Sequence, residues 1–253
     1  MPVTVAYDEQ LARVRITASS VTGASAVVER STNQIRWTTV RGGSGVAVTG
    51  GAVRLDDYEF APGVPNWYRV RGTNSQTAVI TPVITRVWLK SLARPFLNRP
   101  VIVSDVSEVT RAARSGIHQV IGRSLPVAVH DVRAGRQWSM TVLTRTDSDR
   151  QAIDMLIASS DTLLVQVPAG SRVPSGYVQV GDTSQQLHAE DPLSVTTLPL
   201  TEVAPPGPDV VGATVTWRSV LNTYATWADL RAAHASWASV LELIGDPQDV
   251  IVQ

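Results

Sequence analysis

Short stretches of alternating hydrophobic and polar residues fill the first third of the chain, and turn-forming residues separate them. Arg13-Val14-Arg15-Ile16-Thr17 shows this alternation most clearly. A period of two is typical of a strand with one buried face. Similar stretches at 27–30, 35–40 and 67–71 are bounded by Gly, Asn and Pro. About six or seven short strands at this spacing predict a β-sandwich over residues 1–86.

One helix interrupts the strand pattern in the middle of the chain. Ile153, Leu156 and Ile157 follow the i, i+3, i+4 spacing of an apolar helix face. We therefore predict a helix over about 148–159, with Asp147 or Ser148 as its N-cap.

The rest of the middle part predicts strands on both sides of that helix. Residues 126–133 and 138–145 predict a β-hairpin whose turn is Ala134-Gly135. Further strands are predicted after the helix, at 162–167, 176–182 and 193–198. Strands around a single helix predict a small β-barrel with one packed helix over residues 87–204.

A proline-rich linker, residues 205–208, separates this barrel from the last part of the chain, because successive prolines stop both helices and sheet pairing. Residues 209–253 contain a hydroxyl residue followed by Trp three times, ten residues apart. The repeats are Thr216-Trp217-Arg218-Ser219, Thr226-Trp227-Ala228-Asp229 and Ser236-Trp237-Ala238-Ser239. Each predicts a short helix whose first turn is capped by the hydroxyl, and Asp229 or Ser239 can complete a capping box.

So short a segment cannot bury three indoles in a core of its own. We therefore expect the repeat to dock on a neighbouring protein, because buried Trp residues are frequent at recognition surfaces. The alternative is a helical hairpin that closes its own domain. The residues predicted to dock are Trp217, Trp227, Trp237, Leu221, Leu230 and Leu241.

Composition excludes several classes of protein. The formal net charge is zero, which argues against a nucleic-acid partner. No apolar run has the length of a membrane span, and the first residues lack the features of a signal peptide. Cysteine is absent, so disulfides and thiolate chemistry are excluded.

No motif in the chain indicates catalysis, a metal or a bound cofactor. The four histidines are scattered without ligand spacing, and Asp56-Asp57 point to opposite faces of a strand. Gly42-Gly43-Ser44-Gly45-Val46 lacks the last glycine of a nucleophile elbow, and no nucleotide-binding loop occurs. We therefore predict that the chain is not an enzyme and holds no cofactor.

Tryptophans in the predicted strands leave an alternative open. Exposed indoles on a sandwich stack on sugars, so the chain is alternatively a carbohydrate-binding adhesion module for host surface glycans. Against this, Trp37 occupies the strand position where sandwich domains bury a Trp, and we expect it in the core. The other tryptophans considered are Trp67, Trp88 and Trp138.

The segment 27–71 resembles a fibronectin type III domain of the kind found in phage tail proteins. In that family a Pro-Gly turn precedes a Tyr that closes a sheet corner. Here the longer spacer Val64-Pro65-Asn66-Trp67 lies between Pro62-Gly63 and Tyr68. The resemblance is carried by Val28-Glu29-Arg30-Ser31, Trp37-Thr38-Thr39-Val40-Arg41, Leu55-Asp56-Asp57-Tyr58-Glu59-Phe60, Ala61-Pro62-Gly63 and Tyr68-Arg69-Val70-Arg71.

The middle part resembles the barrel domain of minor and distal tail proteins from long-tailed, siphovirus-type phages of actinobacteria. The matching stretches are Gly122-Arg123-Ser124-Leu125-Pro126-Val127, Leu163-Leu164-Val165-Gln166-Val167-Pro168 and Tyr177-Val178-Gln179-Val180-Gly181-Asp182. Units like Trp-Ala-Asp-Leu also recur at the ends of such proteins.

This resemblance implies a structural protein of the virion tail, made in the cytoplasm of a bacterial host. It implies a tube-like barrel that assembles into a ring of six or three copies around the tail axis. Its other partners would be the tail tube, the tape measure or the tail hub. A ring needs charge-complementary faces at every joint, and the predicted inter-subunit residues are Arg111, Arg114, Arg123, Arg133 and Arg136.

Overall fold

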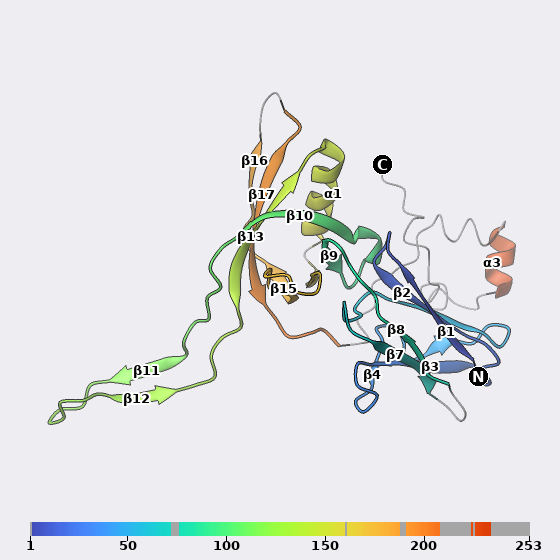
Figure 1. Cartoon of the computed structure of the whole chain (residues 1–253), viewed down its shortest axis with the longest axis horizontal. Helices are drawn as coiled ribbons and strands as arrows, with labels where there is room; N and C mark the ends of the chain where they lie inside the picture. The colour runs from blue at the N-terminus through green and yellow to red at the C-terminus, as the bar shows by residue number, and fades with distance from the viewer. Residues whose placement is uncertain are drawn as a thin grey trace.

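A computed structural model describes residues 2–71, 76–159, 161–187, 191–207, 224 and 226–233. The described chain is mainly β-structure, as predicted. Two packed β units lie side by side, and a long two-stranded arm projects from the second unit (Figure 1). No helix in the described ranges has the length and apolar character needed to cross a membrane.

The first unit consists of two antiparallel sheets around one core. One sheet has the order β1-β2-β6, and the other has the order β4-β3-β7-β8 with β5 paired to β3. Alternate residues of the longer strands enter the core, among them Ile16, Val28 and Tyr68. The strands are β1 (Val3–Asp8), β2 (Arg13–Ala18), β3 (Ser25–Ser31), β4 (Thr38–Thr39), β5 (Val46–Ala47), β6 (Val53–Asp57), β7 (Asn66–Arg71) and β8 (Ala78–Ile80).

Trp37 lies outside this core, so the prediction that it is buried there was wrong. The predicted strand at 35–40 is reduced to the two residues of β4, because the preceding residues form a loop. The Asn33 side-chain oxygen accepts hydrogen bonds from the backbone N–H groups of Ile35 and Arg36. These bonds stabilise a turn instead of a strand. Trp37 is half-buried at the surface and donates its Nε1–H to Gln34 O at 3.1 Å.

The second unit is a closed six-stranded antiparallel barrel, which confirms the predicted β-barrel. Its order is β13-β10-β9-β14-β15-β17, and the pairing of β13 with β17 closes it. A further strand, β16, pairs with one end of β17. The strands are β9 (Val87–Ser91), β10 (Arg99–Val106), β13 (Gln137–Thr144), β14 (Leu163–Gln166), β15 (Gly176–Val180), β16 (Ser184–Leu187) and β17 (Ser194–Glu202), and a short 3-10 helix covers Pro95–Leu97.

The predicted helix is present as α1 (Asp147–Ala158) and packs against the barrel. Ile153 and Leu156 are buried in the barrel core, as their spacing predicted. The N-cap is Thr146, one residue before Asp147 and two before Ser148, the two predicted caps. Its hydroxyl accepts a hydrogen bond from Asp149 N at 3.1 Å, and this satisfies one N–H of the first turn.

The hairpin predicted over 126–145 was wrong. Its two halves pair with other strands: β12 (Val127–His130) with β11 (Ser115–His118), and β13 with β10 and β17. Gly135 lies where a Cβ would stand 2.7 Å from Glu202 O, so it permits a close approach to β17 and forms no turn. The turn lies instead near Gly122, whose φ is +85°.

The C-terminal part is described only in a short section, α3 (Trp227–Ala233). The capping box predicted for this repeat is present. Thr226 Oγ1 accepts from Asp229 N at 3.2 Å, and Asp229 Oδ2 accepts from Thr226 N at 3.1 Å. The other predicted docking residues, Trp217, Trp237, Leu221 and Leu241, lie outside the described residues.

Candidate functional site

The most unusual feature of the molecule is the ribbon of residues 107–136, which we call the arm. It joins β10 to β13 and extends far from the barrel, with β11 and β12 near its end (Figure 1). Backbone hydrogen bonds connect its two sides along its length, from Thr110 N to Gln137 O and from Asp131 N to Arg114 O, both at 2.8 Å. At about 3.3 Å per residue the arm reaches roughly 45 Å.

Local features at the root fix where the arm leaves the barrel. The register between β10 and β13 shifts between Val103 and Asp105, and a bulge of this kind bends a strand. On the returning side, the Arg136 guanidinium donates to Glu202 in β17 at 2.7 and 3.0 Å and to Ser175 O at 2.7 Å. Hydrogen bonds from Arg136 lower the pKa of Glu202 to about 2.

The arm is apolar on both faces and has no core of its own. In the register of β11 and β12, Ile117 faces one side, whereas Val127 and Val129 face the other. Eight of the sixteen large hydrophobic side chains exposed in the described chain belong to it. They are Val109, Ile117, Val120, Ile121, Leu125, Val127, Val129 and Val132. An isolated two-stranded ribbon is marginally stable in water, and an exposed apolar surface of this kind is typical of interaction sites.

The arm is also basic. Its exposed arginines are Arg111, Arg114, Arg123 and Arg133, and its acidic residues are Glu108 and Asp131. Arg136, the fifth arginine predicted to pair between subunits, lies at the root and forms its ion pair with Glu202 of the same chain. The structure thus places four of the five candidates together on the exposed ribbon.

An acidic surface of the same chain lies on α1. The helix has three aspartates, Asp147, Asp149 and Asp154, and one arginine, Arg150, which approaches the first and last of them at 3.4 Å. Met155 adds an exposed apolar side chain to this surface. In Figure 1, α1 lies against the barrel whereas the arm points away from it.

The two β units are joined by side chains that point out of the barrel and into the first unit. Trp88 and Lys90 of β9 and Gln166 of β14 are buried there. Lys90 Nζ donates to Ala12 O at 2.5 Å and to Tyr58 O at 2.8 Å. Burial lowers the pKa of Lys90 to about 7, although nearby carboxylates oppose the shift.

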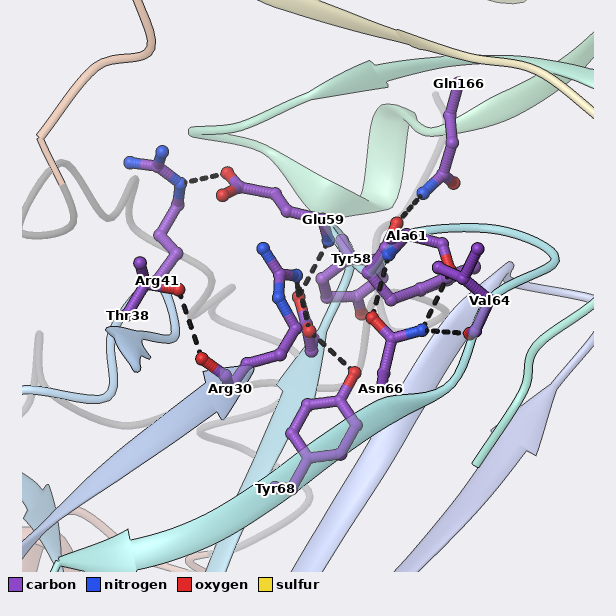
Figure 2. A network of polar contacts seen from close by, with 12 residues as sticks. Arg30, Thr38, Arg41, Tyr58, Glu59, Ala61, Val64, Asn66, Tyr68 and Gln166 are labelled. Atoms are coloured by element: carbon purple, nitrogen blue, oxygen red, sulfur yellow. Dashed lines mark hydrogen bonds and ion pairs between the residues drawn. The ribbon is translucent and has the colours of Figure 1, made fainter. Parts of the chain in front are cut away.

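A polar network lies behind this junction, at the end of β6 (Figure 2). Asp57 accepts from Arg30 Nη1 at 2.7 Å, from the Tyr68 hydroxyl at 2.8 Å and from Glu59 N at 2.8 Å. Burial and the adjacent Asp57 charge raise the pKa of Tyr68. Asn66 fixes the loop before Tyr68. Its side-chain oxygen accepts from Ala61 N, and its side-chain NH₂ donates to the carbonyl oxygens of Ala61 and Val64.

Glu59 connects three parts of the chain. Its carboxylate accepts from Arg41 Nε at 2.5 Å and from the Tyr177 hydroxyl of the barrel at 3.3 Å. Arg41 also donates to the carbonyl oxygens of Pro206 and Gly207, at 3.2 and 2.6 Å. The described part of the predicted linker is therefore held against the first unit.

The remaining candidates are the two described docking residues of α3 and a possible metal site. In α3, Trp227 is 57% exposed whereas Leu230 is 3% exposed, so of these two docking candidates only Trp227 presents a surface. Acidic and histidine side chains in the described ranges form no cluster that could hold a metal ion.

Sequence reasoning missed both the junction and the length of the arm. The continuous burial of β9, whose residues 88–91 are all buried, is the signature of a strand covered on both faces.

Neither a protein-family model nor a curated protein sequence matches this chain.

Proposed function

We propose that the chain is a structural component of a phage tail, of the minor-tail or distal-tail type, which assembles into a ring through its arm. The observation that carries this proposal is the arm itself, a basic ribbon with apolar side chains on both faces and no covering core. Such a surface is stable in water only when another surface covers it.

A second copy of the chain fits this surface. The arm has an excess of arginines, and α1 has an excess of aspartates with an exposed Met155 among them. An arm that docks on the α1 surface of the next copy makes a head-to-tail contact between two different surfaces. Contacts of this type generate rings when the rotation closes. The resemblance to tail proteins adds the expected copy number of six or three.

The first unit supports the same family assignment. Its two sheets, β1-β2-β6 and β4-β3-β7-β8, have the two-layer arrangement expected for a fibronectin type III domain. Tyr68 occupies the corner position, although its hydroxyl bonds the Asp57 carboxylate rather than a backbone group. The longer spacer before Tyr68 is accommodated by Asn66.

Charge-reversal substitutions on the arm and on α1 test whether the chain forms a ring. We expect the wild-type chain to have a mass in solution three or six times that of the monomer, measured by light scattering after size exclusion. Arg114→Glu with Arg123→Glu should leave a monomer, because these arginines would face the acidic helix. Adding Asp147→Arg and Asp154→Arg to that variant should restore the oligomer.

The matched control is Arg54→Glu, a reversal at an exposed arginine of β6 far from the arm in sequence. It should leave the mass unchanged, and all variants should keep the circular dichroism of the wild type. A wild-type chain that stays monomeric at every concentration, or an arm reversal that assembles normally, would overturn the proposal.

Trp227 provides a separate prediction for the docking of another tail protein. Trp227→Ala should weaken binding to that protein by upwards of about 2 kcal/mol, since Trp residues are typical hot spots. The melting temperature should hardly change because the side chain is largely exposed. Leu230→Ala, at a buried position, should instead lower the melting temperature. Equal effects of both variants on melting alone would favour the hairpin that closes its own domain.

A further inference from the structure

The outer face of the β3–β7 sheet carries an arginine held in an unusual way. Arg69 Nε donates to Glu29 at 2.7 Å, and the Arg69 guanidinium lies over the Trp37 ring with its centre 4.1 Å from the ring centroid. Glu29 is 2% exposed, so this carboxylate is a buried anchor. The two terminal NH₂ groups of Arg69 donate to no group in the described part of the chain.

Neighbouring side chains extend this surface. Arg71 follows Arg69 on the same face of β7 and also donates to Glu29. Trp67 precedes Arg69 on that face and pairs across the strands with the exposed Val79. Trp67 and Trp37 are both partly exposed. The face therefore combines two fixed guanidinium groups with two accessible indoles.

We propose that this face binds an acidic glycan, with a sugar carboxylate on Arg69 and Arg71 and sugar rings against Trp67 and Trp37. A guanidinium fork pairs with two carboxylate oxygens at once. Arg69 is prepared for this contact because the Glu29 anchor and the stacked Trp37 already fix its plane, so little side-chain entropy remains to be lost. Partly exposed indoles provide the flat apolar surface that the rings require.

Charge selects an acidic ligand over a neutral one. Arg69 and Arg71 carry two positive charges on this face of the sheet, and Glu29 is the opposing charge. The proposal is independent of ring assembly, since the arm contributes no residue to this face. A monomeric arm variant should therefore bind the glycan as well as the wild type does.

Calorimetric titration of the full chain with an oligogalacturonate tests the site. Arg69→Gln should weaken binding by about tenfold or more, the typical contribution of a hydrogen bond to a charged group. Arg69→Lys should also weaken it, because it keeps the charge but loses the fork. Arg54→Gln, on the other sheet, removes an equivalent exposed charge and should leave affinity unchanged. Circular dichroism and melting verify that each variant is folded.

Ligand controls separate charge from sugar recognition. The methyl-esterified oligogalacturonate, which is neutral, should bind at least about tenfold more weakly. Poly(glycerol phosphate), which has anions but no sugar rings, should also bind more weakly. Wild-type affinity in Arg69→Lys, equal losses in Arg69→Gln and Arg54→Gln, or equal binding of either control ligand would overturn the proposal.

Discussion

Asp57→Ala should lower the free energy of unfolding by about 3–5 kcal/mol. The Asp57 carboxylate is 2% exposed and accepts from Arg30, the Tyr68 hydroxyl and the Glu59 backbone N–H. Removing it leaves a partly buried cation, a buried hydroxyl and a partly buried N–H without this acceptor, and each such group costs free energy when desolvated. Chemical denaturation measures the change, and the melting temperature should fall by roughly 10 °C.

The matched control is Asp154→Ala, the same substitution in the ion pair with Arg150 on α1, with both variants measured in the monomeric Arg114→Glu, Arg123→Glu background so that subunit contacts do not contribute. It should change stability by no more than about 0.5 kcal/mol, as is typical of i,i+4 pairs on a helix surface. If Asp57→Ala and Asp154→Ala had similar effects, the buried network would not contribute to folding in the way described.

The stability of the protein should rise by about 3 kcal/mol between pH 7 and pH 9.5. The cause is Lys90, whose pKa is lowered from 10.5 to about 7 by burial. Between these two values the unfolded chain binds a proton that the folded chain does not, so rising pH favours the folded state. Below pH 7 both states hold the proton, and Lys90 makes no further contribution. Urea denaturation at a series of pH values measures the effect.

Lys90→Met serves as the variant for this prediction, because it keeps a long side chain but cannot titrate. Its stability should lose the rise between pH 7 and pH 9.5. Above pH 10 the opposite trend should appear in both proteins, since burial raises the pKa of Tyr7 and Tyr177 to about 12, and the unfolded tyrosines then ionise first. An unchanged slope in Lys90→Met would show that another group is responsible.

Local patterns predicted those elements whose pairing is decided by one buried face. Alternation located β2 and β7, and the apolar spacing located α1 to within one residue. The same alternation in 126–133 and 138–145 did not reveal which strands are partners, because pairing depends on segments far apart in sequence. Gly135 shows the difficulty: a glycine indicates a turn or a close approach, and only the position of Glu202 decides between them.

The candidate sites were less predictable than the fold. The sequence of β12 has the alternation of a half-buried strand, yet its side chains are exposed, because no second layer from the described part of the chain covers the arm. The sequence does contain the four arm arginines that were predicted to pair between subunits. The contact of Arg69 with Trp37 depends on β4 and β7 being brought together on either side of β3.

The burial of Lys90 has a practical consequence for mapping the neighbours of this protein. Lys90 is the only lysine in the sequence, and its amine is enclosed between the two β units. Amine-directed cross-linkers therefore find no lysine side chain on the surface of the folded protein. Reagents that couple carboxylates or arginines would reach the α1 aspartates and the arm. Labelling of Lys90 itself would report separation of the two units, without any engineered probe.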